Sequence, residues 1–125
     1  MFDHVEFAVG DIAASRGFYS AALEALGVEE FFFDRKAGSA GFGQGEITGL
    51  LIYTGELGPR RMHICFQAHS QAEVKAAHAA ALAHGGRDNG APGYRPHYAP
   101  GYYAAFTFDP DGNNVEFLFR EPLPA

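Results

Sequence analysis

The chain contains two copies of one short pattern, and this repeat limits the folds open to it more than any other feature. Residues 4–9 (HVEFAV) and residues 63–68 (HICFQA) both begin with histidine and then alternate between the two faces of a strand. The copies are 59 residues apart, and so are Leu23 and Leu82 in the helical patterns that follow. A constant spacing over strand and helix predicts two similar modules.

A helix is predicted after each of these strands. In the first module Asp11 is a suitable N-cap, and Gly27 ends the helical pattern. In the second module Ser70 and Glu73 have the spacing of a capping box, and glycines 85–86 end the pattern. The positions expected to face the core are Phe18, Tyr19, Ala22, Leu23 and Leu26 in the first helix and Val74, Ala77, His78, Ala81 and Leu82 in the second.

The rest of each module is predicted to form strands joined by turns. Strands are expected at 31–33, 47–53, 102–108 and 114–119. The glycine-rich segment 36–45 is expected to form hairpin turns. Aligning Leu50 with Glu116 leaves seven extra residues in the second module. These are assigned to segment 87–101, which is predicted to be a loop that covers a site.

This order of elements predicts an α+β fold made of two βαβββ modules, about 1–58 and 60–121, in a single domain 1–125. Each module would have a helix on one face of a four-stranded sheet. Together they would form an eight-stranded curved mixed sheet, an open barrel with the helices on its outer face. His4, Glu6, His63, Cys65 and Gln67 are expected to point into the concave trough.

Composition excludes several classes of function. The chain has 9 Lys and Arg against 15 Asp and Glu, a net charge of −6, and no basic block. A nucleic-acid or anionic-membrane surface is therefore not expected. No apolar run reaches the roughly 18–20 residues of a membrane span, and no signal peptide is recognised. The single cysteine, Cys65, excludes an intramolecular disulfide and predicts a cytoplasmic protein.

Three segments resemble the vicinal oxygen chelate superfamily, which includes glyoxalase I, fosfomycin-resistance proteins, bleomycin-binding proteins and extradiol dioxygenases. They are DHVEFAVGDIAASRGFYSAAL, MHICFQA and FTFDPDGNNVEFLF. The resemblance implies a divalent metal (Fe, Mn, Zn or Ni) in the trough, a small oxygenated substrate and a homodimer. Carried over by position, the family's metal ligands become His4, His63 and Glu116.

The residue types agree with this ligand set. Two imidazoles and one carboxylate leave open positions at which a metal can bind two substrate oxygens. Glu116 lies between Val115 and Phe117, and a carboxylate in an apolar strand is costly unless it is paired or ligated. Glyoxalase I has a fourth ligand, a glutamate, whose matching position here is predicted to be Leu50. Its absence makes the set resemble those of extradiol dioxygenases and fosfomycin transferases.

Segment 95–103 supplies further candidates. His97, Tyr98 and Tyr103 are predicted as acid–base groups, and Arg95 and Tyr102 as substrate-binding residues. The alternative is a loop anchored by aromatic packing.

The leading hypothesis is a metal-dependent lyase, isomerase or dioxygenase. The alternative is a metal-free drug- or metabolite-binding protein of the bleomycin-resistance type, and a third is an accessory domain without a ligand. Retention of both histidines and the glutamate favours the enzyme. Substrate, metal and reaction type stay open, as does whether the site lies within one chain or is shared across a dimer.

Overall fold

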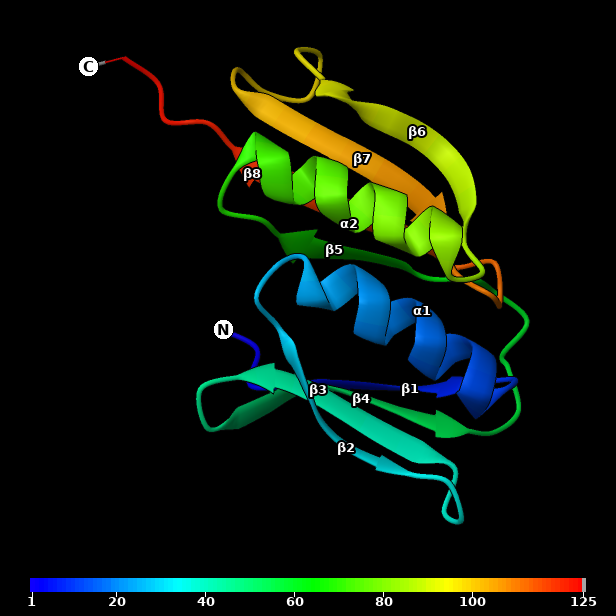
Figure 1. Cartoon of the computed structure of the whole chain (residues 1–125). Coiled ribbons are helices and arrows are strands. Elements are labelled where there is room, and N and C mark those ends of the chain that lie inside the picture. Colours follow the sequence, from blue (N-terminus) through cyan, green and yellow to red (C-terminus); the bar gives the residue numbers. More distant parts are fainter. Residues whose placement is uncertain (125) are drawn as a thin grey trace.

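The computed structural model describes residues 1–124 of the 125, and it has the predicted β-α-β-β-β order twice (Figure 1). The first module comprises β1 (Val5–Val9), α1 (Ile12–Glu24), β2 (Glu29–Asp34), β3 (Ser39–Gln44) and β4 (Ile47–Thr54). The second comprises β5 (His63–Gln67), α2 (Gln71–Ala83), β6 (Arg87–Tyr94), β7 (Tyr102–Phe108) and β8 (Asn114–Arg120). The predicted α+β fold is confirmed.

The eight strands form two mixed sheets of four. Their orders are β1-β4-β3-β2 and β5-β8-β7-β6, with β1–β4 and β5–β8 parallel and the other pairs antiparallel. The first and last strands of each module are therefore neighbours, although about 40 or 50 residues of chain separate them. Figure 1 shows β1 and β5 on the facing sides of the two modules.

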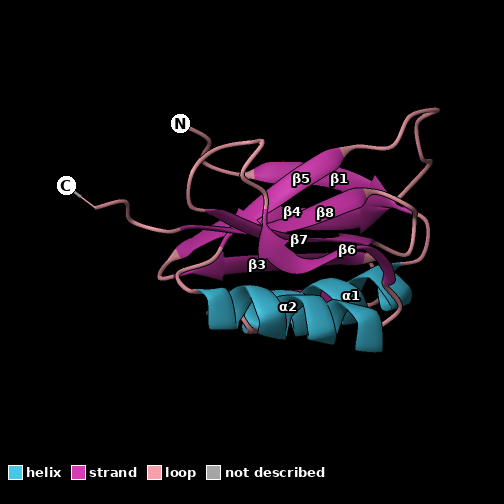
Figure 2. Cartoon of the chain, turned by 90° about the horizontal axis from the view of Figure 1, so that it is seen from above, coloured by secondary structure: helices cyan, strands magenta, loops and turns pink. Residues whose placement is uncertain are grey.

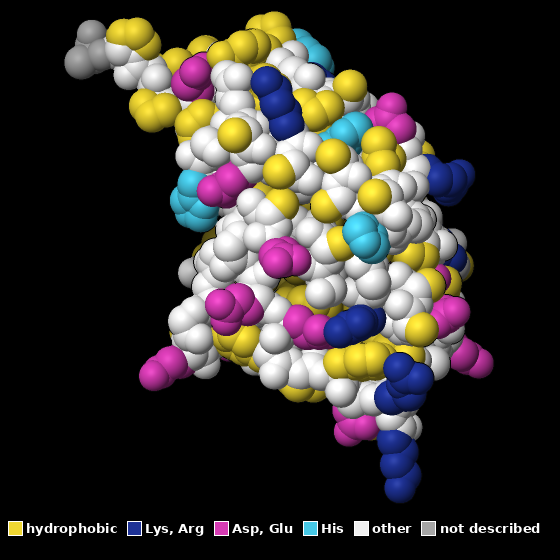
Figure 3. All heavy atoms as spheres, viewed as in Figure 1, with side chains coloured by type: hydrophobic (Ala, Val, Ile, Leu, Met, Phe, Trp, Pro, Cys, Tyr) yellow, Lys and Arg dark blue, Asp and Glu magenta, His cyan; other side chains and the backbone are white. Residues whose placement is uncertain are grey.

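Both helices lie on one side of the strands, and each packs on its own sheet (Figure 2). They also contact each other, so a single apolar core extends across both modules. Its largest fully buried side chains include Tyr19, Phe18, Phe42 and Phe117. Leu82 was predicted to face this core, but it is 38% exposed because it lies at the edge of the apolar stripe of α2. Figure 3 shows acidic, basic and hydrophobic side chains interspersed on the helix side.

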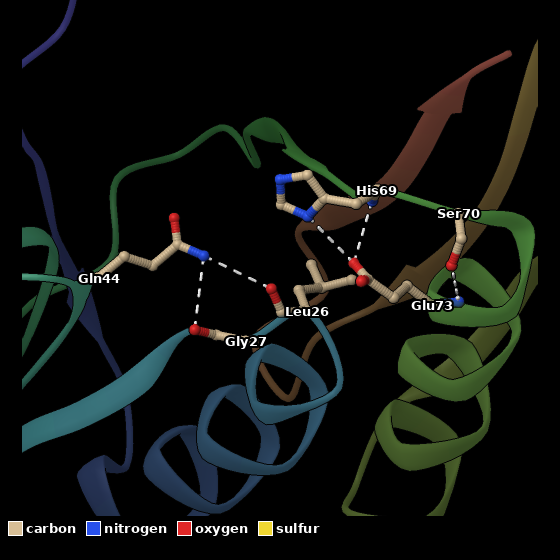
Figure 4. A network of polar contacts seen from close by, with 6 residues as sticks. All are labelled: Leu26, Gly27, Gln44, His69, Ser70 and Glu73. Atoms are coloured by element: carbon tan, nitrogen blue, oxygen red, sulfur yellow. Dashed lines mark hydrogen bonds and ion pairs between the residues drawn. The ribbon is translucent and has the colours of Figure 1, made fainter.

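The predicted caps hold the helix ends. Asp11 Oδ1 accepts a hydrogen bond from Ala13 N at 3.0 Å, and Ser70 Oγ accepts one from Glu73 N at 3.1 Å. The Glu73 carboxylate turns back to the backbone N–H of His69, as Figure 4 shows. At the other end of α1, the side-chain amide of Gln44 donates to the carbonyls of residues 26 and 27. The caps thus satisfy orphan N–H groups at the start of each helix, and Gln44 ties down the chain that follows α1.

Two glycine-rich segments predicted as turns or loop each contain a strand, whereas residues 95–101 form turns as expected of a loop. The segment 36–45 contains β3, a central strand in which Gly41 lies against the Phe32 ring. A Cβ at Gly41 would come within 2.3 Å of that ring, so glycine serves close packing here. The segment 87–101 contains β6. This is an edge strand with two register shifts and Gly90 at φ +152°, features that an edge tolerates.

A buried polar network joins the modules at the turn between β7 and β8. Asp109 is 1% exposed and accepts hydrogen bonds from Asn113 N and, at 2.5 Å, from the hydroxyl of Tyr19 on α1. The backbone N–H of Gly10 donates to Asp111 in the same turn. Burial and the nearby Asp109 carboxylate raise the pKa of Tyr19 well above its usual value. The first module therefore holds the turn from which β8 begins.

Among the described residues, no helix is both long and apolar enough to cross a membrane.

Candidate active site

The second sheet has an open face, defined here as the side of β5, β7 and β8 opposite the helices. Val115 and Phe117 of β8 point into the core, so Glu116 between them points to the open face. The register places Glu116 opposite Cys65 of β5 and Phe106 of β7. A small second apolar cluster on this face contains Ala104, Phe106, Leu118 and Tyr102.

Glu116 is the centre of this face. Its side chain is almost fully buried, with the residue 3% exposed. One carboxylate oxygen lies 2.8 Å from His63 Nε2, and the other accepts a hydrogen bond from the hydroxyl of Tyr102. Both oxygens of a carboxylate that would be costly to bury alone are therefore satisfied.

The carboxylate affects its polar neighbours. Desolvation, together with the nearby Glu116, raises the pKa of the Cys65 thiol to about 12. Desolvation and the hydrogen bond to Glu116 also raise the pKa of Tyr102 above its usual value. At neutral pH Cys65 is a thiol rather than a nucleophilic thiolate, and Tyr102 is a proton-carrying donor.

The turn between β6 and β7 extends this cluster with aromatic rings. The Tyr98 ring lies 5.2 Å from the Tyr102 ring, and the His97 ring lies 4.3 Å from the Tyr98 ring, measured between centroids. Tyr103 points the other way and is 5% exposed in the core. The Arg95 guanidinium donates to the carbonyls of Gly93 and Ala91. The structure thus brings His97, Tyr98 and Tyr102 together and directs Tyr103 to the opposite face.

The three predicted metal ligands do not meet within the chain. His4 lies just before β1, and its Nδ1 is 2.7 Å from a carboxylate oxygen of Asp3, with both side chains exposed. Across residues 1–124, no group of three or more His, Cys, Asp and Glu side chains is placed to hold a metal. His63 and Glu116 are in contact, and His4 stands apart from them.

The donor pair nevertheless fits two positions on one ion. Ligands at about 2.1 Å from a metal, at adjacent octahedral positions, are about 3.0 Å from each other. The 2.8 Å between His63 Nε2 and the Glu116 oxygen is close to this spacing. The pair could therefore occupy two positions of a metal ion, and a third protein ligand would have to come from another element.

The position equivalent to Glu116 in the first module is Leu51, and the predicted match to Leu50 is wrong by one residue. Val5 pairs with Leu50 as Ile64 pairs with Val115, so Leu50 corresponds to Val115. Leu50 accordingly lies in the core, 4% exposed. The alignment passed through turns of different length, and a slip of one residue moves a side chain to the other face. The equivalent position is still apolar.

An apolar cavity of about 610 Å³ lies between the modules beside this site. Val5 and Leu50 line it from the first module, and Ile64 and Phe66 line it from β5. His63 also lines the cavity, so a ligand that contacts this imidazole has room for an apolar part nearby.

Sequence reasoning missed Arg120 at the end of β8. Its guanidinium carbon lies 5.1 Å from the centre of the Tyr102 ring. The strand alternation could have indicated it, because residues 116, 118 and 120 of one strand share a face, which places Arg120 on the same side as Glu116. The composition of segment 95–103 favoured Arg95 instead, whose guanidinium is used on backbone carbonyls.

The family model described as the Glyoxalase/Bleomycin resistance protein/Dioxygenase superfamily matches residues 1–117. Among solved structures, the chain is similar to a glyoxalase/bleomycin resistance protein from Albidiferax ferrireducens T118. The identity is 30% and the TM-score 0.79, over 97% of this chain and 99% of that one. No curated protein matches.

Two more distant structures share the fold. A glyoxalase-related enzyme from Fulvimarina pelagi is 20% identical with a TM-score of 0.73, over 100% of this chain and 93% of that one. Lactoylglutathione lyase from Agrobacterium tumefaciens is 20% identical with a TM-score of 0.66, over 95% and 92% of the two chains.

Proposed function

Because the chain belongs to the glyoxalase/bleomycin resistance protein/dioxygenase superfamily, we propose that it is a metal-dependent enzyme acting on a small oxygenated substrate. The observation that carries the proposal is the contact between His63 and the buried Glu116 on the open face. His63, Glu116 and His4 would hold a divalent ion. When bound, such an ion polarises the vicinal oxygens of a substrate and stabilises the negative charge that develops on them.

We assign His4 to the site of a second copy of the chain. Within one chain His4 pairs with Asp3, whereas His63 and Glu116 supply only two donors. A homodimer that brings His4 of one copy to the His63–Glu116 pair of the other would complete a set of two imidazoles and one carboxylate. This set alone does not choose between the lyase or isomerase and the dioxygenase alternatives.

The other residues of the site act on protons and orientation. The Tyr102 hydroxyl donates to Glu116 and thereby fixes the direction of the carboxylate. Tyr98 and His97 extend from Tyr102 toward solvent, and we assign them to proton transfer between substrate and solvent. Arg95, with two of its nitrogens on backbone carbonyls, shapes the turn that carries them.

Metal analysis of the purified protein tests the proposal. Wild-type protein should bind metal stoichiometrically, and His63→Ala and Glu116→Gln should each lose most of it. His84→Ala is a matched control, because this exposed histidine lies at the end of α2 and its ring forms a hydrogen bond with the backbone carbonyl of Ala80 in the same helix. Metal content that is low and unchanged by His63→Ala would rule the proposal out.

One observation favours a second candidate, a metal-free binding protein. The cavity of about 610 Å³ is lined mainly by apolar side chains and can take a small apolar ligand without a metal. Ligand titration before and after treatment with a chelator separates the two candidates, because a metal-free binding protein would retain its ligand affinity after the metal is removed.

A further inference from the structure

Arg120 places a positive charge beside the candidate site. It follows Glu116 by four residues on β8, so both side chains lie on the open face. Its guanidinium carbon lies 5.1 Å from the centre of the Tyr102 ring, whose hydroxyl donates to Glu116. The ring of Tyr102 therefore connects the guanidinium to the carboxylate.

This guanidinium has free donors. Among residues 1–124, no carboxylate forms an ion pair with Arg120 and no hydrogen bond from its side chain is recorded, although the chain has 15 acidic residues. Arg16, by comparison, is paired with Glu30 through two hydrogen bonds, and Arg95 donates to two carbonyls. Glu116, the carboxylate on the same face of β8, is already engaged by His63 and Tyr102.

A free guanidinium stacked on an aromatic ring is suited to bind an oxyanion. Stacking limits the motion of the side chain and leaves its N–H groups in one plane, where they match the two oxygens of a carboxylate or phosphoryl group. The net charge of −6 makes a local cation more important, since the protein as a whole repels anions.

We propose that Arg120 is the anion-binding residue of the site, and that the substrate carries a carboxylate or phosphoryl group in addition to its chelating oxygens. The Tyr102 ring lies between Arg120 and Glu116, so the two parts of the substrate are separated by a body about the size of one ring. This inference rests on the proposed function for the position of the chelating oxygens, but the anion site itself needs no metal.

The first arm of the test uses metal-free protein with benzoate and phenylphosphonate, followed by NMR titration. We expect weak binding that Arg120→Gln reduces about ten-fold or more, as for loss of a hydrogen bond between charged groups. Arg35→Gln is the matched control, because the Arg35 guanidinium lies over the ring of Phe33, 5.8 Å from its centre, in the other module. The tighter of the two probes identifies the carboxylate or the phosphoryl group.

The second arm uses zinc-loaded protein with catechol, which is neutral, and 3,4-dihydroxybenzoate, which adds a carboxylate to the same vicinal oxygens. The wild type should prefer the anionic probe about ten-fold or more, and Arg120→Gln should remove this preference, measured as the ratio of the two affinities. Arg120→Lys should retain part of it, because the charge remains without the planar fork.

The outcomes distinguish the two claims. Absence of probe binding in the first arm, or binding that Arg120→Gln leaves unchanged, overturns the anion site. Anion binding that depends on Arg120 in a protein that takes up no zinc supports the anion site and overturns the proposed metal function.

Discussion

At the scale of single residues, the site depends on how one buried carboxylate is satisfied. Glu116 has two oxygens and two partners, His63 and Tyr102, and the Arg120 guanidinium lies over the Tyr102 ring. Loss of either partner would leave one buried carboxylate oxygen without a hydrogen bond, which lowers the stability of the folded protein. The residues around it are therefore expected to contribute to stability as well as to chemistry.

Tyr102→Phe should destabilise the protein by about 1–3 kcal/mol, because it removes the donor to one oxygen of Glu116. Urea unfolding followed by circular dichroism measures the change. Tyr98→Phe is the control, since Tyr98 is 59% exposed, and it should change stability by less than about 0.5 kcal/mol. Equal effects of the two substitutions would mean that the Tyr102 hydroxyl does not stabilise the buried carboxylate.

At the scale of elements, register decides which leucine of β4 faces the site. Leu51 is the counterpart of Glu116, whereas Leu50 is buried in the core. Leu51→Glu should therefore fold with a stability change of about 1 kcal/mol, and it should raise metal affinity by adding a carboxylate. Leu50→Glu should cost more than about 4 kcal/mol, because it buries an unpaired charge. Thermal unfolding and metal titration of both variants check this, and the reverse order would refute the register.

The buried hydrogen bond from Tyr19 on α1 to Asp109 in the β7–β8 turn predicts that the stability of the protein depends on pH. The pKa of Tyr19 is raised in the folded protein, so its contribution is complete below the unfolded value of about 10 and is lost as pH rises above it. Tyr19→Phe should cost about 1–3 kcal/mol at pH 7, and this difference should shrink above pH 10. Unfolding between pH 7 and pH 11 measures it, with the exposed Tyr53→Phe as control. A constant difference would contradict the prediction.

Elements with clear periodicity could be predicted, and those governed by packing could not. The alternation at 4–9 and 63–68 and the caps at Asp11 and Ser70 act locally, so they were visible in the sequence. The strand character of β3 depends on the Phe32 ring that covers Gly41, and that of β6 depends on its pairing with β7. These causes lie elsewhere in the chain, and local composition indicated turns instead.

At the scale of the whole molecule, the repeat predicted two modules but not their relative placement. The strand pattern put His4 and His63 at equivalent positions of the two modules. Equivalent positions in two modules are not necessarily close in space. The relative placement of the modules follows from the packing of α1 against α2 and from the hydrogen bond between Tyr19 and Asp109. It leaves His4 apart from the His63–Glu116 pair, which lies on the open face of the other sheet.

A site shared by two copies can be tested by mixing variants. His4→Ala and His63→Ala should each fail to bind metal as pure proteins, since every site then lacks one imidazole. If the two copies exchange, the mixture should recover about a quarter of the wild-type metal content. Half of the dimers would then be mixed, and each of these would contain one intact site built from His4 of one copy and His63 and Glu116 of the other. A mixture of His63→Ala with Glu116→Gln is the control, because each copy contributes its His63 and its Glu116 to the same site, so the two changes always damage different sites and exchange restores neither. Each mixed dimer would then contain two damaged sites, so metal content should stay low. Failure of the first mixture to recover metal, in dimers shown by mass spectrometry to be mixed, would mean that His4 serves its own chain or no site at all.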